Sequence, residues 1–178
     1  MIFSLISFFI KHYICQEQNK SLLSRVCLLI KMGDIPLAEL TLRKYEKPYE
    51  LDHRELVKKI CLSLGMLQPG DSRDIIVDIL LVLVNASKEK KKIDSEEIRK
   101  QAEELRKKHN LLLNGLAESN IRRQLKRLRD AMLIEKKENL YYISEFQPLS
   151  NIFESKIEKF LLPEILERVK EYLKALDE

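Results

Sequence analysis

The chain has 178 residues, of which 45% are apolar and 34% are charged, with four Gly, five Pro and no Trp. This composition is typical of a helix-rich, soluble globular protein, and the length is sufficient for one well-buried domain with accessory helices. The three cysteines form no CxxC motif and no Cys/His cluster, which argues against a disulfide framework or a zinc site. We expect them to be buried thiols of a cytoplasmic protein.

The positive charge is concentrated in one part of the chain. The net charge is +4, yet residues 88–137 contain 16 Lys and Arg against 9 Asp and Glu, whereas residues 138–178 contain 5 against 9. A surface that binds a polyanion needs such a concentration of charge, although a solvated helical surface has the same appearance.

Residues 1–31 are expected to be an apolar helical extension. The run of residues 1–10 is nearly all apolar, but Lys11 and His12 end it well short of the roughly 20 residues that a membrane-spanning helix requires. It lacks the leading basic residues and the cleavage site of a signal peptide. We therefore expect no membrane association. Two alternatives to a helical extension of the protein remain: the segment is a membrane anchor, or the protein starts at Met32.

Residues 32–70 are expected to form N-terminal accessory helices. The first covers residues 37–46, between two prolines. Asp52 and Glu55 form a capping box at the start of the second, and Gly65 ends it.

Residues 71–144 end in a basic helix and a hairpin. In chain order we expect helices over residues 73–86, 96–109 and 117–132, and strands over residues 133–137 and 140–144. Four apolar residues of the third helix recur at helical spacing and should point inward: Ile121, Leu125, Leu128 and Met132. Its outer faces then carry Ser119, Asn120, Arg122, Arg123, Lys126 and Arg129.

This helix and hairpin resemble the recognition helix and wing of archaeal and bacterial winged helix-turn-helix regulators. The resemblance lies in Ser119-Asn120-Ile121-Arg122-Arg123-Gln124-Leu125-Lys126-Arg127-Leu128, followed by Leu133-Ile134 and a lysine-tipped hairpin. It covers residues 71–144 and implies a mainly α fold with a small β-hairpin wing. Such proteins usually have Gly before the Leu-Ile pair, where this chain has Met132, so either the turn differs or the helix runs on.

Residues 145–178 are expected to form two C-terminal helices. The first starts at Ser150 or Asn151 and ends at Leu161, and Pro163 opens the second. Their apolar strip has coiled-coil-like spacing in the second helix and is broader than the wing could cover. We therefore expect these helices to pack on the N-terminal helices or on a second copy of the chain. The side chains expected to hold two copies of the chain together are Ile157, Phe160, Leu166, Val169, Leu173 and Leu176.

The family resemblance implies that the basic helix enters the major groove of double-stranded DNA. The residues expected to contact bases are Asn120, Arg123 and Gln124, because Arg suits guanine and an amide suits adenine. The residues expected near phosphates are Arg122, Lys126 and Arg127. Ser119, on the outer face of the same helix, is also expected to bind the nucleic acid. Lys136 and Lys137 at the tip of the wing should reach an adjacent groove or the backbone.

We therefore expect a homodimeric, DNA-binding transcription regulator. The same basic surface could instead bind structured RNA or a ribosomal subunit through shape and backbone contacts, or it could be incidental to a protein-interaction module. The sequence contains no Gly-rich phosphate loop and no nucleophile–base constellation, and its three histidines are widely separated. We accordingly expect no catalysis, no cofactor and no metal.

Overall fold

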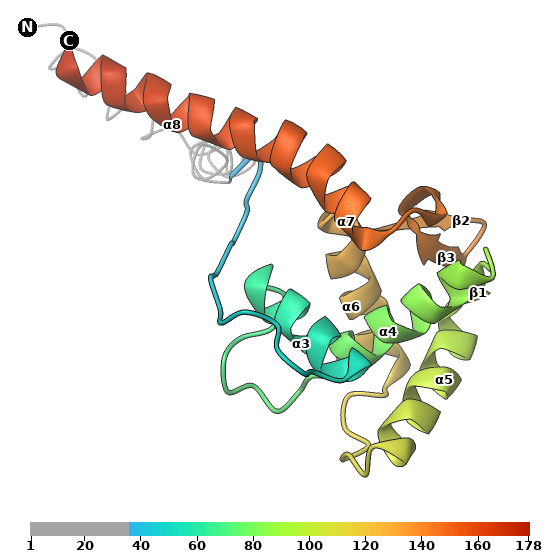
Figure 1. Ribbon diagram of the computed structural model, residues 1–178. Helices are drawn as coiled ribbons and strands as arrows, with labels where there is room; N and C mark the ends of the chain where they lie inside the picture. Colours follow the sequence, from blue (N-terminus) through green and yellow to red (C-terminus); the bar gives the residue numbers. More distant parts are fainter. Residues whose placement is uncertain (1–35) are drawn as a thin grey trace, which may run out of the picture. The chain divides into compact units, whose positions relative to one another are not determined.

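The computed structural model describes residues 36–178, of which residues 38–178 form one compact unit (Figure 1). The predictions for residues 1–31 lie outside the described residues. The described chain is mainly helical with one three-stranded antiparallel sheet, which confirms the expected mainly α class with a small hairpin. Sequence analysis places segment boundaries near residues 70 and 145. Both fall inside this one compact unit.

Helix α3 (His53–Ser63) begins and ends where the sequence predicts. Asp52 accepts a hydrogen bond from the backbone N–H of Glu55 at 2.6 Å, so the aspartate caps the helix. Gly65 follows the helix with φ +69°, and a Cβ added there would lie 2.5 Å from the Cβ of Thr41. Glycine is required at this turn for both reasons.

The helix predicted over residues 37–46 is wrong, because residues 36–52 form no helix. Arg43 gives the physical reason. Its backbone N–H donates to the carbonyl of Ser63 at 2.8 Å, and its guanidinium donates to the carbonyls of Leu62 and Leu67. Carbonyls at the end of a helix lack intrahelical partners. Through these bonds of Arg43, the non-helical segment of residues 36–52 caps the C-terminal end of α3.

Helix α4 (Ile75–Lys88) forms the centre of the core. Every residue from Ile75 to Leu83 is buried, and the helix packs against α3, α5 (Ser95–Lys108) and α6 (Glu118–Asp130). A helix that is apolar around most of its circumference must be covered on several sides. The neighbours of α4 supply that cover.

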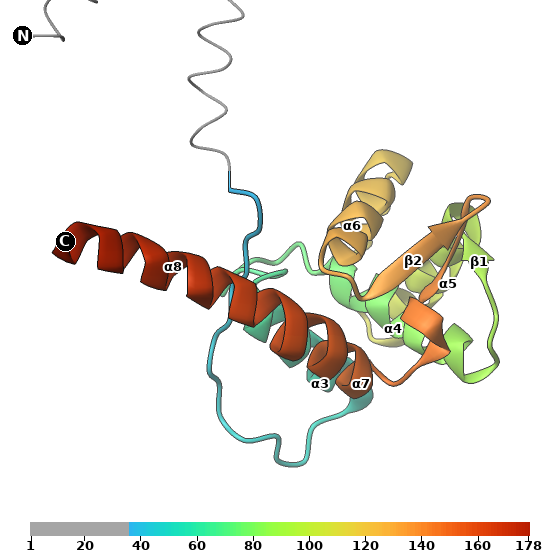
Figure 2. The same ribbon diagram turned by 90° about the horizontal axis from the view of Figure 1, so that it is seen from above.

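The sheet has the strand order β1–β3–β2. Its strands are β1 (Ile93–Asp94), β2 (Ile134–Lys137) and β3 (Leu140–Ile143). Glu138 and Asn139 join β2 to β3 with φ of 52° and 64°, as a two-residue hairpin turn requires, and this confirms the predicted turn. Strand β1 is too short to be predicted from a pattern. Strand β2 lies beside α6 (Figure 2).

Met132 adopts the left-handed conformation that is usual for glycine, with φ 60°. Helix α6 ends at Asp130, two residues earlier than predicted. The Leu133 N–H then donates to the carbonyl of Leu128 at 3.1 Å, and the Met132 N–H donates to that of Arg129 at 2.8 Å. This pair of bonds is the Schellman motif. The turn is therefore the one that glycine normally makes, and the helix does not run on.

Replacing Met132 with glycine is expected to raise the free energy of unfolding by about 1 kcal/mol, because the left-handed conformation costs a non-glycine residue about that much. Urea denaturation of the two proteins measures the difference. A variant of lower stability would mean that contacts of the half-buried Met132 side chain outweigh the backbone strain.

The two predicted C-terminal helices are one. Helix α7 (Leu149–Ile152) continues through a π-helical stretch (Phe153–Leu161) into α8 (Leu162–Asp177). Leu161 and Leu162, just before Pro163, keep helical dihedral angles. Ile157 was expected at a subunit contact, but it is only 2% exposed and belongs to the core of its own chain. That assignment is wrong, because Ile157 anchors the start of the helix.

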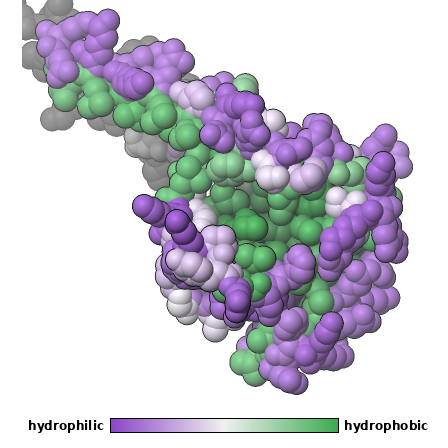
Figure 3. Space-filling model, viewed as in Figure 1, coloured by the Kyte–Doolittle hydropathy of each residue, from purple (hydrophilic) through white to green (hydrophobic). Residues whose placement is uncertain are grey.

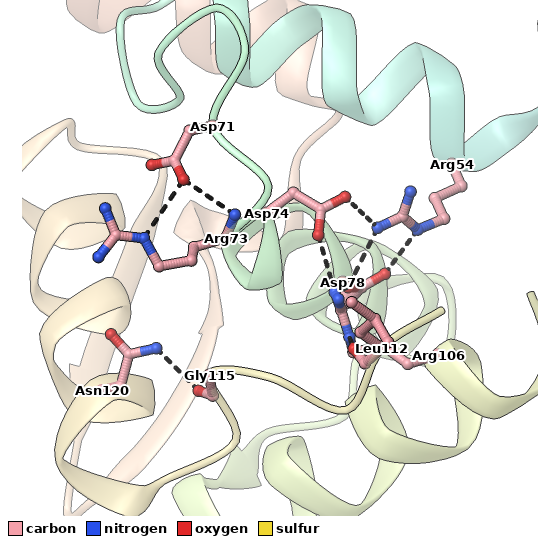
Figure 4. A network of polar contacts seen from close by, with 9 residues as sticks. All are labelled: Arg54, Asp71, Arg73, Asp74, Asp78, Arg106, Leu112, Gly115 and Asn120. Atoms are coloured by element: carbon pink, nitrogen blue, oxygen red, sulfur yellow. Dashed lines mark hydrogen bonds and ion pairs between the residues drawn. The ribbon is translucent and has the colours of Figure 1, made fainter. Parts of the chain in front are cut away.

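Four buried charged side chains join α3, α4 and α5 (Figure 4). Arg54 donates to Asp74 and Asp78, both at 2.7 Å. Arg106 donates to Asp74 at 2.9 Å, to Asp78 at 2.5 Å, and to the carbonyl of Leu112 at 2.7 Å. Asp78 is fully buried. Buried charges are tolerated when each has opposite partners and hydrogen bonds, as in this network.

Stability is expected to fall in acid, in part through Asp74. Burial disfavours its charged form, but hydrogen bonds from Arg54 and Arg106 outweigh burial and hold its pKa below the ordinary value of 3.8. The stabilisation from Asp74 is therefore fully present above its unfolded pKa and is lost as the pH falls through the folded pKa. Urea denaturation at about pH 7 and about pH 3 measures this loss. Asp74→Asn should lose less stability on acidification than the wild type, and an equal loss would contradict the assignment.

Candidate nucleic-acid interface

The outer face of α6 is cationic. Its apolar residues Ile121, Leu125 and Leu128 are fully buried, so the residues between them turn towards solvent. The exposed residues of this face are Ser119, Arg122, Arg123, Lys126 and Arg129. Acidic residues occur in this helix only at its two ends, Glu118 and Asp130.

The charges of this face are accessible. Arg122 pairs with Glu118 one turn earlier, and both side chains are more than half exposed. A surface pair of this kind contributes about 0.3–0.5 kcal/mol, so a phosphate could replace the carboxylate at little cost. Within residues 36–178, Lys126 and Arg129 form no ion pair.

The amides expected to contact bases are instead engaged within the chain. Asn120 donates to the carbonyl of Gly115 at 2.8 Å and accepts hydrogen bonds from Arg123 at 2.7 Å and Gln124 at 3.1 Å. Gln124 is only 7% exposed and accepts a bond from Arg127 at 2.9 Å. Gln124 therefore does not lie on the exposed face, contrary to the prediction, and Asn120 is half-buried.

Arg127 is exposed, but its guanidinium is bonded within the chain. One of its terminal nitrogens donates to the carbonyl of Met66 at 2.6 Å, in the segment between α3 and α4. The bond to Gln124 holds a second nitrogen. The predicted phosphate contact of Arg127 is thus restricted to the side of α6 that faces this segment.

The basic helix and the hairpin form one surface. Arg129 of α6 and Lys136 and Lys137 of β2 line the same hollow of about 490 Å³, together with Lys156 and the carboxylate of Glu135, which lie 3.5 Å apart as an ion pair. Lys136 and Lys137 are exposed, as predicted. Arg129 has no role among the expected contacts, although its spacing from Arg122 and Lys126 signals that it shares their face.

Tyr142 is the partly exposed tyrosine of the hairpin, and Tyr141 is buried. The Tyr142 ring stacks on Phe146 with centroids 5.1 Å apart, and the Lys92 ammonium lies 4.4 Å from its centroid. The Tyr142 ring is thus already in contact with Phe146 and Lys92 of its own chain.

Other classes of site have no support in the part of the chain that the structure describes. No cluster of His, Cys, Asp and Glu in residues 36–178 is suited to a metal ion, and no helix there is long and apolar enough to cross a membrane. Cys61 is completely buried, and burial raises the pKa of its thiol to about 12, so it is a poor nucleophile.

Comparisons with family models, with curated proteins and with solved structures give no match to this chain. Function is therefore inferred from the geometry of the chain itself. That geometry is a cationic helix next to a lysine-tipped hairpin.

Proposed function

We propose that residues 71–144 are a winged helix-turn-helix module that binds double-stranded DNA, in a protein that acts as a transcription regulator. The order of elements supports this proposal. Helix α4, strand β1, helices α5 and α6 and the β2–β3 hairpin follow in the order of such modules. In this assignment α6 is the recognition helix and the hairpin is the wing.

One observation carries the proposal: Arg129 of α6 and Lys136 and Lys137 of the hairpin line one hollow. A duplex carries one negative charge per about 1.7 Å of its axis, so it binds best to cations that lie on one continuous face. Arg129 and the two hairpin lysines meet that condition, and the one carboxylate of the lining, that of Glu135, is paired with Lys156. If the basic residues of α6 served only for solubility, nothing would require Lys136 and Lys137 to lie on the same side of the molecule as Arg129.

The engaged amides suggest how the module recognises DNA. Asn120 and Gln124 bind within the chain, which leaves Ser119 and the arginines and lysines as the exposed donors. Arginine can bind guanine through two hydrogen bonds, and both residue types bind phosphates. We therefore expect a binding site read mainly through guanine and the backbone, rather than through adenine.

The proposed nucleic acid is tested by offering the purified full chain duplex DNA, total RNA and ribosomal subunits at two salt concentrations. Preferential co-sedimentation with duplex DNA that weakens steeply with salt supports the proposal. Binding to ribosomal subunits alone would identify an RNA-binding factor instead. Binding to none of the three would favour a protein-interaction module.

We further propose that the regulator is a homodimer joined through α8. No residue of α8 is buried, although apolar side chains recur along one side at spacings of three, four and three. Its half-exposed or more exposed members are Leu166, Val169, Tyr172, Leu173 and Leu176, preceded by Phe160. Figure 3 shows hydrophobic surface running along one side of this helix. Such spacing is typical of helices that pair with a second copy.

Replacing Leu166 and Leu173 with glutamine is expected to convert the dimer into a monomer, because both side chains lie in the apolar strip of α8. Light scattering of the full chain measures the mass. The matched control replaces Glu164 and Glu171 on the opposite side of the same helix with glutamine, and it should remain a dimer. A wild-type chain that is already monomeric, or a variant that stays dimeric, would contradict the assignment. Substitution is preferable to deletion, since removing the whole segment would also remove the buried Ile152 and Ile157.

A further inference from the structure

A second cationic site adjoins the outer face of α6 and shares Arg123 with it. A hollow of about 430 Å³ separates α6 from the segment that leads into α4. Three guanidinium groups line it, those of Arg73, Arg123 and Arg127, together with a single carboxylate, that of Asp71. Figure 4 shows Arg73 and Asp71 on one side of this space and Asn120 on the other. The hollow therefore has an excess of positive charge.

The arginines keep most of their hydrogen-bonding capacity. Each guanidinium has five N–H donors. Among residues 36–178, Arg73 uses its Nε in a long 3.3 Å contact with Asp71, and Arg123 uses one terminal nitrogen towards Asn120. Donors of both side chains thus remain available to a ligand.

Arg127 is already held in position. Its bonds to the side chain of Gln124 and to the carbonyl of Met66 fix the guanidinium plane between α6 and the segment after α3. A donor that is fixed before binding loses less conformational entropy when a ligand arrives. This accounts for the role of Gln124, which positions Arg127.

We propose that Arg73, Arg123 and Arg127 form a phosphate-binding site. Guanidinium groups bind phosphate oxygens in pairs of parallel hydrogen bonds, and three of them around one hollow suit a doubly charged anion. If the proposed function holds, the phosphate belongs to the DNA backbone beside the groove that α6 enters. The alternative source of the same group is a free phosphorylated small molecule.

The test variant is Arg73→Ala. The Arg73 side chain is 79% exposed and its only described partner is Asp71, so the change should leave the fold intact. Arg168→Ala on α8 is the matched control, because it removes the same charge from an exposed side chain outside the hollow. The probes are inorganic pyrophosphate, titrated calorimetrically, and a short duplex, titrated at several salt concentrations.

The wild type and the control should bind pyrophosphate in the absence of nucleic acid, and Arg73→Ala should bind it at least about tenfold more weakly. If the phosphate is that of the backbone, Arg73→Ala should also reduce the slope of log K against log salt for the duplex by about 0.9. An unchanged slope with lost pyrophosphate binding would identify a free phosphorylated ligand at the same site.

The two proposals fail separately. Pyrophosphate binding that depends on Arg73 in a protein without affinity for duplex DNA would retain the phosphate site and overturn the DNA-binding function. The opposite result would overturn the phosphate site alone. In that case the wild type binds duplex DNA but not pyrophosphate, and Arg73→Ala and Arg168→Ala have the same salt slope.

Discussion

Replacing Arg122, Lys126 and Arg129 with alanine is expected to weaken the binding of duplex DNA by at least about tenfold at physiological salt. All three side chains are exposed on the outer face of α6, away from the buried Ile121 and Leu125. If each contacts a phosphate, the slope of log K against log salt should become shallower by about 0.9 for each lost contact. Fluorescence anisotropy over a range of salt concentrations measures both quantities.

The matched control for this variant replaces Arg168, Lys170 and Lys174 of α8 with alanine. It removes the same net charge from exposed positions, so it measures general attraction between a cationic protein and DNA. The salt slope of the control should stay close to that of the wild type. Equal slopes in the two triple variants would contradict the assignment of α6 as the recognition helix. Alanine is a strong helix former, so denaturation curves should confirm that α6 remains folded.

Replacing Asp78 with asparagine is expected to lower the free energy of unfolding by about 3–5 kcal/mol, the usual cost of breaking a buried ion pair by removing one partner. Asp78 is fully buried and accepts hydrogen bonds from both Arg54 and Arg106. Asparagine preserves the shape of the side chain and removes its charge, which leaves two buried guanidinium groups with one carboxylate. Urea denaturation measures the change.

The control for this variant is Glu103→Gln. Glu103 also has two basic partners, Arg99 and Lys107, but they lie on the surface of α5. Its replacement should change the free energy of unfolding by less than about 1 kcal/mol. A double-mutant cycle with Arg54→Met adds a second check, since contacting residues should be clearly non-additive. Additive effects would mean that Arg54 and Asp78 do not stabilise one another.

The elements with strong periodicity could be predicted from the sequence. Helix α6 follows from the spacing of Ile121, Leu125 and Leu128, and α3 follows from its capping residues. Residues 37–46 were predicted wrongly because their conformation depends on Arg43, which bonds to carbonyls some twenty positions later. The spacing of residues within a short segment contains no information on a hydrogen-bond partner so far along the chain.

The candidate site was predictable in part. Spacing correctly placed Arg122, Arg123 and Lys126 on the exposed face. Gln124 was misplaced, although it lies three residues after Ile121 and four before Leu128, which puts it at the edge of the buried stripe. Spacing could have found that error, but it could not reveal that the amide binds Asn120 and Arg127.

The buried charges left one signal in the sequence. Asp78 lies in the middle of the apolar run Ile75–Leu83, and an aspartate at such a position needs a buried cation. The cations themselves, Arg54 and Arg106, come from helices on either side in the chain. Only the packing of three helices identifies them.

That packing decides how much of the chain can be transplanted into another protein. A fragment of residues 71–144 alone would keep Asp74, Asp78 and Arg106 but lose Arg54, so a buried site would carry surplus negative charge. The smallest portable unit that carries the basic helix and hairpin must therefore start upstream of α3. Any rearrangement that carries α6 without α3 leaves the buried carboxylates Asp74 and Asp78 with a single arginine.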